Sequence, residues 1–366
     1  GAENATEGED ASLRFAGRGA WEFDALAYVQ RRDFSNVVVS ATRFVPTLDQ
    51  RTTPATGVGG KLELRPPVGG RHVLRIGADY RQAIGELQEE AISAVTGLVT
   101  EQRRAGGANS DFGLFVEDDW PIGPLTLTAG ARADRTNIRD GFVSARSPVG
   151  IVLTETRFPD RAAWSASFRG GVLLRLNGGL SVRASAYTGL RLPTLNELYR
   201  GFVIFPVVTR ANAALRNERL EGYEVGLDWR PGERFSLAVT AFDNRVRDAI
   251  ANVTIGRDLR QRRNIAAVGS RGIEAATSAR FGVLGFSGTL AYSDAVVRGG
   301  PGAEALDGKR PAQTPRWAAS GTVSWRPSWG WQVALSARHV GAQFEDDLET
   351  DVLPAATTLD GYAEVP

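Results

Sequence analysis

Few residues in this chain are of the types that perform catalysis. There are two histidines, His72 and His339, and no cysteine. A general base or a zinc site needs partner side chains at close range, whereas His72 begins one strand-like stretch and His339 ends another. We therefore predict that both histidines are structural, that the chain is not an enzyme, and that it has no catalytic residues and no metal site. A membrane-embedded hydrolase with a Ser–His pair is the enzymatic alternative.

Two further segments have compositions that suit ligand binding. Residues 345–351 form an acidic stretch whose carboxylates suit calcium, but the central glycine of an EF-hand is missing, and we expect a solvated loop. Residues 57–60 have the sequence Gly-Val-Gly-Gly, which cradles phosphate only where a helix follows. A strand-like stretch follows instead, and we expect a loop-to-strand junction. The sequence implies no cofactor.

Aromatic and basic side chains are concentrated around residues 199–210, and basic side chains alone around residues 257–263. Aromatic rings and guanidinium groups together suit flat, anionic ligands such as catecholates. The second stretch also suits lipopolysaccharide phosphates. A self-packed loop and plain surface charge are the alternatives, and both stay open. The candidate ligand-binding residues are Tyr199, Arg200, Phe202, Phe205, Arg210, Arg260 and Arg262.

The elements that position these residues are strands. Apolar and polar residues alternate over segments of about ten residues, as in 72–81, 220–229 and 235–244. Successive side chains of a strand point to opposite faces, so each segment has one apolar and one polar face. The pattern predicts about fifteen strands, near residues 11–17, 20–30, 57–65, 71–82, 99–120, 125–136, 161–176, 180–190, 219–230, 233–245, 264–281, 283–295, 315–326, 331–342 and 357–366.

The connections between these strands alternate in length. Short turns are expected at 66–70, 121–124, 177–179, 230–233, 281–284 and 327–330, and long polar connections at 83–109, 137–160, 191–218, 246–263, 295–314 and 343–356. Outer-membrane barrels have this alternation of short periplasmic turns and long extracellular loops. All eight tryptophans fall near predicted strand ends, where amphipathic rings occupy the headgroup level. We therefore predict an all-β, antiparallel up-and-down transmembrane β-barrel.

Several segments resemble the barrel portion of TonB-dependent outer-membrane receptors. Residues 186–199 resemble a strand-to-loop segment of that family with the motif Arg-x-Pro-Thr-x-x-Glu-Leu, although Leu190 stands where the family usually has phenylalanine. Residues 264–274 are similar to its Asn…Gly-Ile-Glu strand. Residues 112–134, 217–226 and 307–316 resemble further segments in the same order, although 217–226 lacks the family's proline. The residues that match the family motifs are Arg191, Pro193, Thr194, Glu197, Asn264, Gly272 and Glu274.

The resemblance implies a barrel of about 22 strands around an N-terminal plug. Residues 1–366 would be a single, incomplete barrel domain with about 15 of those strands, and the plug would lie outside this chain. The implied protein is a receptor of the bacterial outer membrane that binds and imports a scarce nutrient, first of all a ferric siderophore, energised through TonB by way of the plug. Cobalamin, haem and oligosaccharides remain open as ligands.

The implied partners are a ferric siderophore or similar nutrient complex, TonB, and outer-membrane lipid and lipopolysaccharide. The net charge of +1 gives no reason to expect a nucleic-acid partner. The rival hypothesis is a passive outer-membrane pore or structural barrel without TonB coupling, whose lumen is open or is narrowed by a loop folded inward. A soluble multi-strand β protein is disfavoured because its strands would expose apolar bands.

Overall fold

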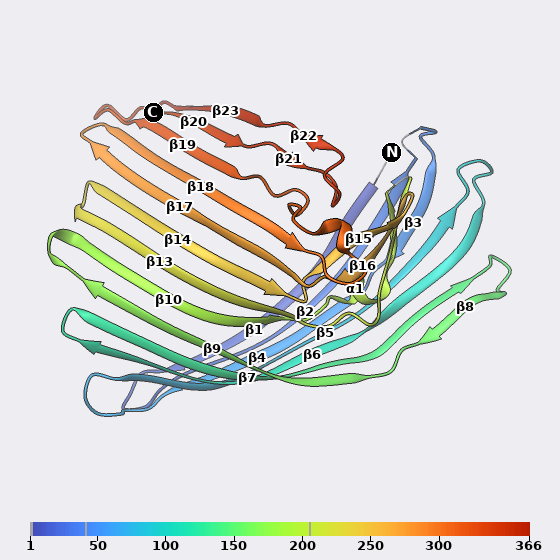
Figure 1. The fold of residues 1–366 in the computed structure, drawn as a ribbon, viewed down its shortest axis with the longest axis horizontal. Helices are drawn as coiled ribbons and strands as arrows, with labels where there is room; N and C mark the ends of the chain where they lie inside the picture. Colours follow the sequence, from blue (N-terminus) through green and yellow to red (C-terminus); the bar gives the residue numbers. More distant parts are fainter. Residues whose placement is uncertain (1–2, 41, 205) are drawn as a thin grey trace.

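The computed structural model describes residues 3–40, 42–204 and 206–366 and consists almost entirely of β-strands (Figure 1). Its main sheet has 17 strands. Fifteen of them pair antiparallel with the next one along the chain. They are β1 (Glu3–Gly17), β2 (Glu22–Val39), β4 (Ala55–Arg65), β5 (Val73–Ile92), β6 (Val99–Ile122), β7 (Leu125–Arg146), β9 (Arg161–Arg175), β10 (Leu180–Arg191), β13 (Glu218–Gly232), β14 (Phe235–Arg247), β17 (Ala267–Phe281), β18 (Leu284–Arg298), β19 (Trp317–Trp325), β20 (Gln332–Val340) and β23 (Ala356–Glu364).

The predicted all-β, antiparallel up-and-down architecture is confirmed, and each predicted strand corresponds to one of these fifteen. Two short strands extend the sheet: β3 (Pro46–Thr52) pairs with β2 and β5, and β8 (Val152–Arg157) pairs with β7. Within the described residues, β1 pairs only with β2, and β23 pairs only with β20. These two strands are therefore the edges of a strongly curved sheet (Figure 1).

Short and long connections lie at opposite ends of the strands (Figure 1). At the turn end, two-residue connections join β6 to β7 and β17 to β18. Gly123 and Gly282 lie in these turns with φ of 59° in both cases, a conformation that side-chain-bearing residues rarely adopt. At the loop end, longer connections carry their own small elements. The predicted alternation of short and long connections holds along most of the chain, but not between β5 and β6, which only residues 93–98 connect. The predicted long connection 137–160 is also partly strand, because β7 continues to Arg146 and β8 follows it.

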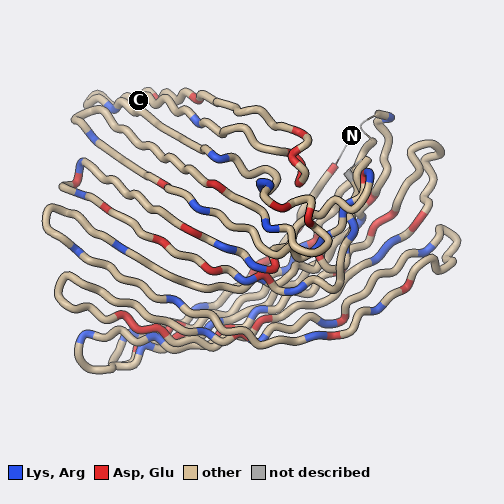
Figure 2. The backbone as a smooth tube through the Cα atoms, viewed as in Figure 1, with Lys and Arg blue, Asp and Glu red and all other residues tan. Residues whose placement is uncertain are grey.

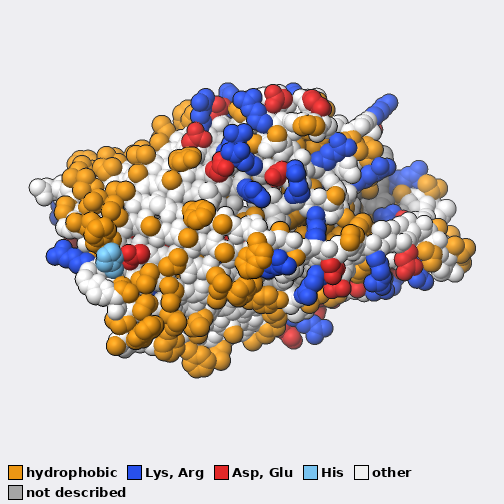
Figure 3. Space-filling view, turned by 60° about the horizontal axis from the view of Figure 1, so that its bottom comes forward, with side chains coloured by type: hydrophobic (Ala, Val, Ile, Leu, Met, Phe, Trp, Pro, Cys, Tyr) orange, Lys and Arg blue, Asp and Glu red, His pale blue; other side chains and the backbone are white. Residues whose placement is uncertain are grey.

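The two faces of the sheet differ in polarity. On β13, the alternate residues Tyr223, Val225, Leu227 and Trp229 are exposed on the outer face, at 36–63% of their full surface. Figure 3 shows apolar side chains spread broadly over one side of the molecule. Figure 2 shows acidic and basic residues in close succession along many strands, and these alternate with the apolar positions. An apolar exterior around a polar interior is the pattern of an outer-membrane barrel.

Seven tryptophans support the same arrangement. Trp21, Trp120, Trp229, Trp329 and Trp331 are 40–62% exposed near the turn end, and Trp164 and Trp317 are 58% and 48% exposed where strands begin at the loop end. Amphipathic rings at both strand ends form the two aromatic girdles expected at a bilayer surface. Within the described ranges, no helix is long and apolar enough to cross a membrane.

The predicted connection 83–109 is wrong in its extent, because most of it is strand. β5 continues to Ile92 and β6 begins at Val99, with 20 and 24 residues respectively, while about ten residues suffice to cross a bilayer. The apolar alternation ends at the membrane boundary, but the backbone pairing continues beyond it. There, cross-strand ion pairs such as Arg104–Glu86 at 2.7 Å stabilise the solvent-exposed hairpin of β5 and β6.

Residues 57–60 also differ from expectation. They lie inside β4, not at a loop-to-strand junction. A Cβ atom on Gly59 would lie 2.5 Å from the Tyr28 hydroxyl oxygen on β2. The glycine therefore makes room for an aromatic ring of the neighbouring strand.

Candidate functional site

Four long connections at the loop end pack against one another, and we call them the loop platform: residues 192–217, 248–266, 299–316 and 341–355. The first contains α1 (Leu195–Tyr199), β11 (Phe202–Ile204) and β12 (Val207–Arg210), and the second contains β15 (Ile250–Gly256) and β16 (Leu259–Asn264). β12 and β16 pair in parallel, so the two connections share one four-stranded sheet. The third carries η2 (Glu304–Leu306), and the fourth carries β21 (Gln343–Phe344) and β22 (Val352–Leu353).

The root of the first connection is an ion cluster centred on Arg191. Its guanidinium donates to both carboxylate oxygens of Glu197 at 3.1 Å and also to Glu218, its direct cross-strand partner. Burial would raise the pKa of Glu197, but the hydrogen bonds from Arg191 and from the Thr194 backbone outweigh it and hold that pKa below its usual value. One ion cluster thus joins the end of β10, the start of β13 and the first connection.

The helix α1 begins with a capping box. The Thr194 hydroxyl accepts from the Glu197 backbone N–H at 3.2 Å, and the Thr194 N–H donates to the Glu197 side chain at 2.7 Å. Such reciprocal bonds satisfy two N–H groups at the start of a helix. A helix of five residues is too short to be stable alone, so this cap and the packing of its apolar side hold it in place.

The first connection folds inward onto the inner face of the sheet. Leu198 and Tyr199 of α1 are 1% and 5% exposed, and they pack with Leu215 against Ala105 of β6 and Ile138 of β7. The Tyr199 ring also stacks on Phe158, with ring centroids 5.3 Å apart. This cluster is a small apolar core between the loop and the wall, and in Figure 1 α1 lies inside the curve of the sheet.

Two arginines tie the first connection to its neighbours. Arg200 donates to the Gln50 side chain at 2.7 Å and lies 3.8 Å from Glu89, so it reaches β3 and β5. Arg262 of β16 donates to the backbone carbonyls of Asn196 and Arg200. Its guanidinium also lies 5.2 Å from the centre of the Phe202 ring. These side chains hold neighbouring connections together.

A second apolar core joins the other three connections. Ala249, Val253, Ile265, Val297, Ala303 and Leu306 are all at most 5% exposed, and Leu348 packs against them. Hydrogen bonds add to this contact: both the backbone N–H and the hydroxyl of Thr254 donate to Asp347 at 2.9 Å. The loop platform is therefore one packed unit with two cores.

The acidic stretch 345–351 differs from the expected solvated loop. Asp346 is 7% exposed, and its carboxylate accepts from Leu348 N–H, Thr350 N–H, the Thr350 hydroxyl and Asp351 N–H at 2.7–3.0 Å. Burial would raise its pKa, but these bonds hold the pKa below the usual value. Among the described residues, no group of three or more His, Asp or Glu side chains is arranged to hold a metal ion.

The predicted ligand-binding residues separate into occupied and open groups. Tyr199 is buried, Arg200 and Arg262 hold loops together, Phe202 packs under Arg262, and Arg260 lies 3.7 Å from Asp347. Arg210 is exposed at the end of β12. Arg257, at the tip of the basic stretch, has a 97% exposed side chain. Phe205 lies outside the described residues. Ligand contact by any of them stays a prediction.

The family-motif residues mostly shape the loop roots. Pro193 is fully buried, and Asn264 binds the backbone of both Arg216 and Asp248. A Cβ on Gly272 would lie 2.0 Å from the Tyr292 carbonyl oxygen on β18, so no larger residue fits there without a shift. Glu274 is exposed in mid-strand on β17.

Sequence reasoning missed several residues that hold the loop platform, chiefly Gln50, Glu89, Glu218, Asp346 and Asp347. Glu218 had a usable signal, because it and Arg191 stand at the facing ends of two predicted strands. Gln50 had none, since it lies 150 positions from its partner Arg200. Each histidine has a structural contact: His72 Nδ1 lies 2.6 Å from Asp118, and His339 Nδ1 lies 2.9 Å from the Thr357 hydroxyl.

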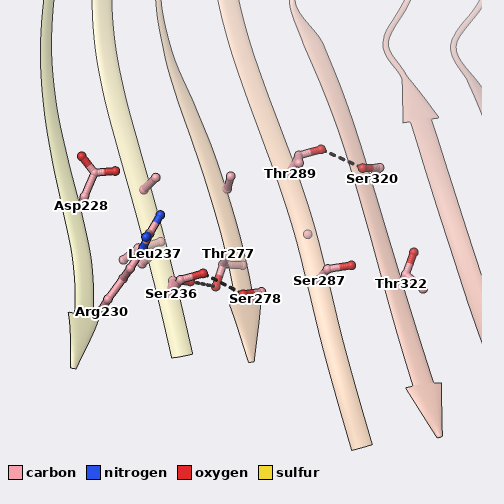
Figure 4. A pocket seen from close by; sticks show the side chains of 13 residues that line it. Asp228, Arg230, Ser236, Leu237, Thr277, Ser278, Ser287, Thr289, Ser320 and Thr322 are labelled. Atoms are coloured by element: carbon pink, nitrogen blue, oxygen red, sulfur yellow. Dashed lines mark hydrogen bonds between the residues drawn. The ribbon is translucent and has the colours of Figure 1, made fainter. Parts of the chain in front are cut away.

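The inner face of the sheet has two parts of different chemistry. On β4 to β10, which we call the charged wall, Arg75 bonds Glu117 at 2.8 Å and Asp119 at 2.7 Å, and Arg132 bonds Asp134 at 2.6 Å. Arg75, Glu117 and Arg132 border a cavity of about 690 Å³. On β14 and β17 to β20, which we call the hydroxyl wall, small side chains border a cavity of about 300 Å³ (Figure 4). Asp228 and Arg230 also border this cavity. The inner-facing hydroxyls at the cavity belong to Ser236, Ser278, Ser287, Thr289, Ser320 and Thr322, and Ser336 bonds to the last of these.

Solved structures with the same fold agree with the sequence resemblance. The ferric yersiniabactin uptake receptor FyuA from Yersinia pestis superposes with a TM-score of 0.74 at 14% identity, covering 98% of this chain and 53% of that one. The copper transporter OprC gives 0.76 at 16% identity, covering 98% and 57%. The chain thus spans little more than half the length of these neighbours.

Sequence comparison gives a relative and a family. Lactoferrin-binding protein A of Neisseria meningitidis serogroup B is 30% identical over 152 residues, which are 41% of this chain and 14% of that protein. The family described as "TonB dependent receptor-like, beta-barrel" matches residues 3–365. Arg191, Thr194 and Glu197, which carried the resemblance, form the charged root and cap of the first connection. The chain belongs to the TonB-dependent receptor-like β-barrel family.

Proposed function

We propose that this chain is part of an outer-membrane receptor that captures a ferric siderophore and imports it with energy transmitted by TonB. The observation that carries the proposal is the loop platform: four connections, locked by two apolar cores, lie at one end of a sheet with an apolar exterior and a polar interior. Such a platform is preorganised, which reduces the entropy lost on binding. The family consists of receptors and transporters, and we propose no catalytic step.

The ligand class follows from the exposed cations of the loop platform. Arg210 is exposed, and so is Arg257, whose guanidinium lies 3.7 Å from the carboxylate of its neighbour Asp258. Arg200, Arg260 and Arg262 are engaged with other loops. Open guanidinium groups attract anionic chelates and bind their oxygens with charge-assisted hydrogen bonds. An anionic ferric chelate therefore fits better than a neutral ligand. Copper complexes and an iron-carrying protein are the alternatives that the printed names of similar proteins suggest.

A passive pore without TonB coupling is the second candidate function. The observation in its favour is the inward-folded first connection, whose α1 packs on the inner face of β6 and β7. Inward loops narrow the lumen of diffusion pores. A pore, however, has no need for four connections tied into one unit, and we rank it second.

The test is uptake by cells that express the full-length gene containing this chain. Radiolabelled iron is supplied with a panel of anionic and neutral siderophores, in matched strains with and without functional TonB. Uptake of anionic chelates that requires TonB supports the proposal. Uptake that is equal in both strains and proportional to concentration contradicts it and indicates the passive pore. Labelled copper and iron-loaded lactoferrin are supplied in parallel. TonB-dependent uptake from one of these sources, without uptake of any ferric siderophore, would contradict the proposed ligand and identify that source as the ligand instead.

The proposed location and remaining partners follow from the outer face. Exposed apolar side chains and the two tryptophan girdles suit outer-membrane lipid. We propose that the loop end faces the cell exterior and its lipopolysaccharide. Cleavage of the loops by protease added to intact cells tests this orientation, because loops that face the periplasm are protected from it.

A further inference from the structure

We infer that a transported solute crosses this protein along the hydroxyl wall and not along the charged wall. The inference rests on the proposed function, because it concerns the route of import. The proposed route runs along the inner face of β14 and β17 to β20, toward the turn end of these strands.

The first argument is charge. The inner-facing positions of β14, β18 and β19, strands that the structure describes in full, contain no Asp, Glu, Lys or Arg. The inner-facing positions of β17 and β20 contain three ionised side chains, Glu274, Arg280 and Arg338, so charge is sparse on this wall. The inner-facing positions of the charged wall contain long ionised side chains that bind one another, such as Arg132 with Asp79 at 2.5 Å and with Asp134 at 2.6 Å. A charged solute moving along that wall would have to break or join these pairs. Hydrogen bonds to ions are stronger than those between neutral groups, so the solute would be held there.

The second argument is the state of the hydroxyls. They bond one another across the strands: Ser236 with Ser278 at 2.7 Å, Thr289 with Ser320 at 2.7 Å, and Thr322 with Ser336 at 2.8 Å. Each hydroxyl has one donor and two acceptor positions, so the paired groups still accept hydrogen bonds from a passing solute. Repeated weak sites favour conduction, because the solute enters readily and also leaves.

The third argument is space. The hydroxyl-bearing side chains of this wall end two bonds beyond Cα, and Ser287, Thr289 and Ser320 are exposed. In Figure 4, the hydroxyls of Ser287, Thr289, Ser320 and Thr322 project from neighbouring strands around one open area. Asp228, which lines the same cavity, bonds Arg183 at 3.1 Å and so joins the charged wall. The hydroxyl wall therefore offers both the room and the weak contacts that a polar solute with hydrogen-bonding groups needs.

Residues 1–366 contain no cysteine, so each variant adds the only thiol within this chain. Any cysteine elsewhere in the full-length protein is first replaced by serine. Ser320→Cys places a single thiol on the hydroxyl wall. Ser167→Cys is the matched control: it makes the same change on β9, at a position that lines the cavity of the charged wall. Both variants are made in the full-length protein and treated in cells with a bulky, water-soluble maleimide.

We expect the maleimide to label Ser320→Cys faster than Ser167→Cys, and to stop import in Ser320→Cys while ligand binding at the cell surface is unchanged. Labelled Ser167→Cys should still import. Faster labelling at Ser167→Cys, or loss of import only there, would overturn the inference, as would unimpaired import after full labelling of Ser320→Cys.

Import by the unlabelled variants tests the proposed function separately. If they import nothing, the proposed function fails, and the relative labelling rates of the two thiols still decide which wall is open to solutes. If they import and the labels have equal effects, only the assignment of the route fails.

Discussion

Replacing Asp346 with asparagine should open one corner of the loop platform. The carboxylate accepts four hydrogen bonds from residues 348–351 at 2.7–3.0 Å, one at Oδ1 and three at Oδ2. An amide has only one accepting oxygen. Its NH₂ group, a donor, would face either the Leu348 N–H or the donors of Thr350 and Asp351, so hydrogen bonds would be lost on that side. The hydrogen bonds that remain would be accepted by a neutral oxygen and not by a carboxylate.

The magnitude follows from this inventory. Hydrogen bonds to a charged group contribute about 1.5–3 kcal/mol, against about 0.5–1.5 kcal/mol for neutral ones. The lost bond alone removes about 1.5–3 kcal/mol and the three weakened bonds add to it, so at least about 3 kcal/mol is expected. That free energy increases the population of the opened loop roughly 100-fold. The effect should be local, because all four of these hydrogen bonds lie within residues 346–351.

Hydrogen exchange of the detergent-solubilised protein measures this opening. Peptides that cover residues 343–353 should exchange roughly 100-fold faster in Asp346→Asn, while those from β6 and β7 should not change. Asp351→Asn is the control, because the Asp351 side chain is exposed. Unchanged exchange in Asp346→Asn, or an equal effect in the control, would refute the role assigned to Asp346.

Acidification provides a second reading of the same group. The folded pKa of Asp346 lies below its ordinary value of about 3.9. Its stabilisation is therefore complete above that ordinary value and is lost as the pH falls through the lower, folded pKa. Loop exchange, corrected for the intrinsic effect of pH, should rise over this acidic window in the native protein and stay flat in Asp346→Asn. A similar rise in both proteins would mean that another group titrates.

Three further predictions concern other parts of the molecule. Arg191→Gln removes the ion pairs at the root of the first connection, so hydrogen exchange in residues 192–217 should accelerate. Arg257→Ser should leave that exchange unchanged. Equal exchange in the two variants would contradict the stabilising role of the Arg191 ion cluster. Gly272→Ala should lower the yield of folded protein, measured by heat-modifiable gel mobility, because the new Cβ meets the Tyr292 carbonyl; a normal yield would show that β17 can shift. Arg257→Ser should slow the association of an anionic siderophore at low salt and have little effect at high salt; an association rate independent of salt would exclude this arginine from capture.

The strand bounds predicted from the alternation of apolar and polar residues were wrong where both faces of a strand are exposed to solvent. The hairpin of β5 and β6 continues far past the apolar band, since backbone pairing and pairs such as Arg104–Glu86 hold it without an apolar face. The acidic stretch 345–351 was misjudged for a related reason. Composition shows that carboxylates are present, but the turn that brings four donors to Asp346 is a property of the folded loop.

The sequence by itself determined the strands, their two faces and the alternation of short turns with long connections. Each of these depends on a local rule: side chains alternate along a strand, and glycines such as Gly123 permit the tight turns. The motif from Arg191 to Glu197 also marked the place where the candidate site is built. Only the tertiary structure decided which loop residues remain open. Contacts such as Arg200 with Gln50, and Arg262 with the carbonyl of Arg200, join segments far apart in the chain, and their pairing is set by the curvature of the whole sheet.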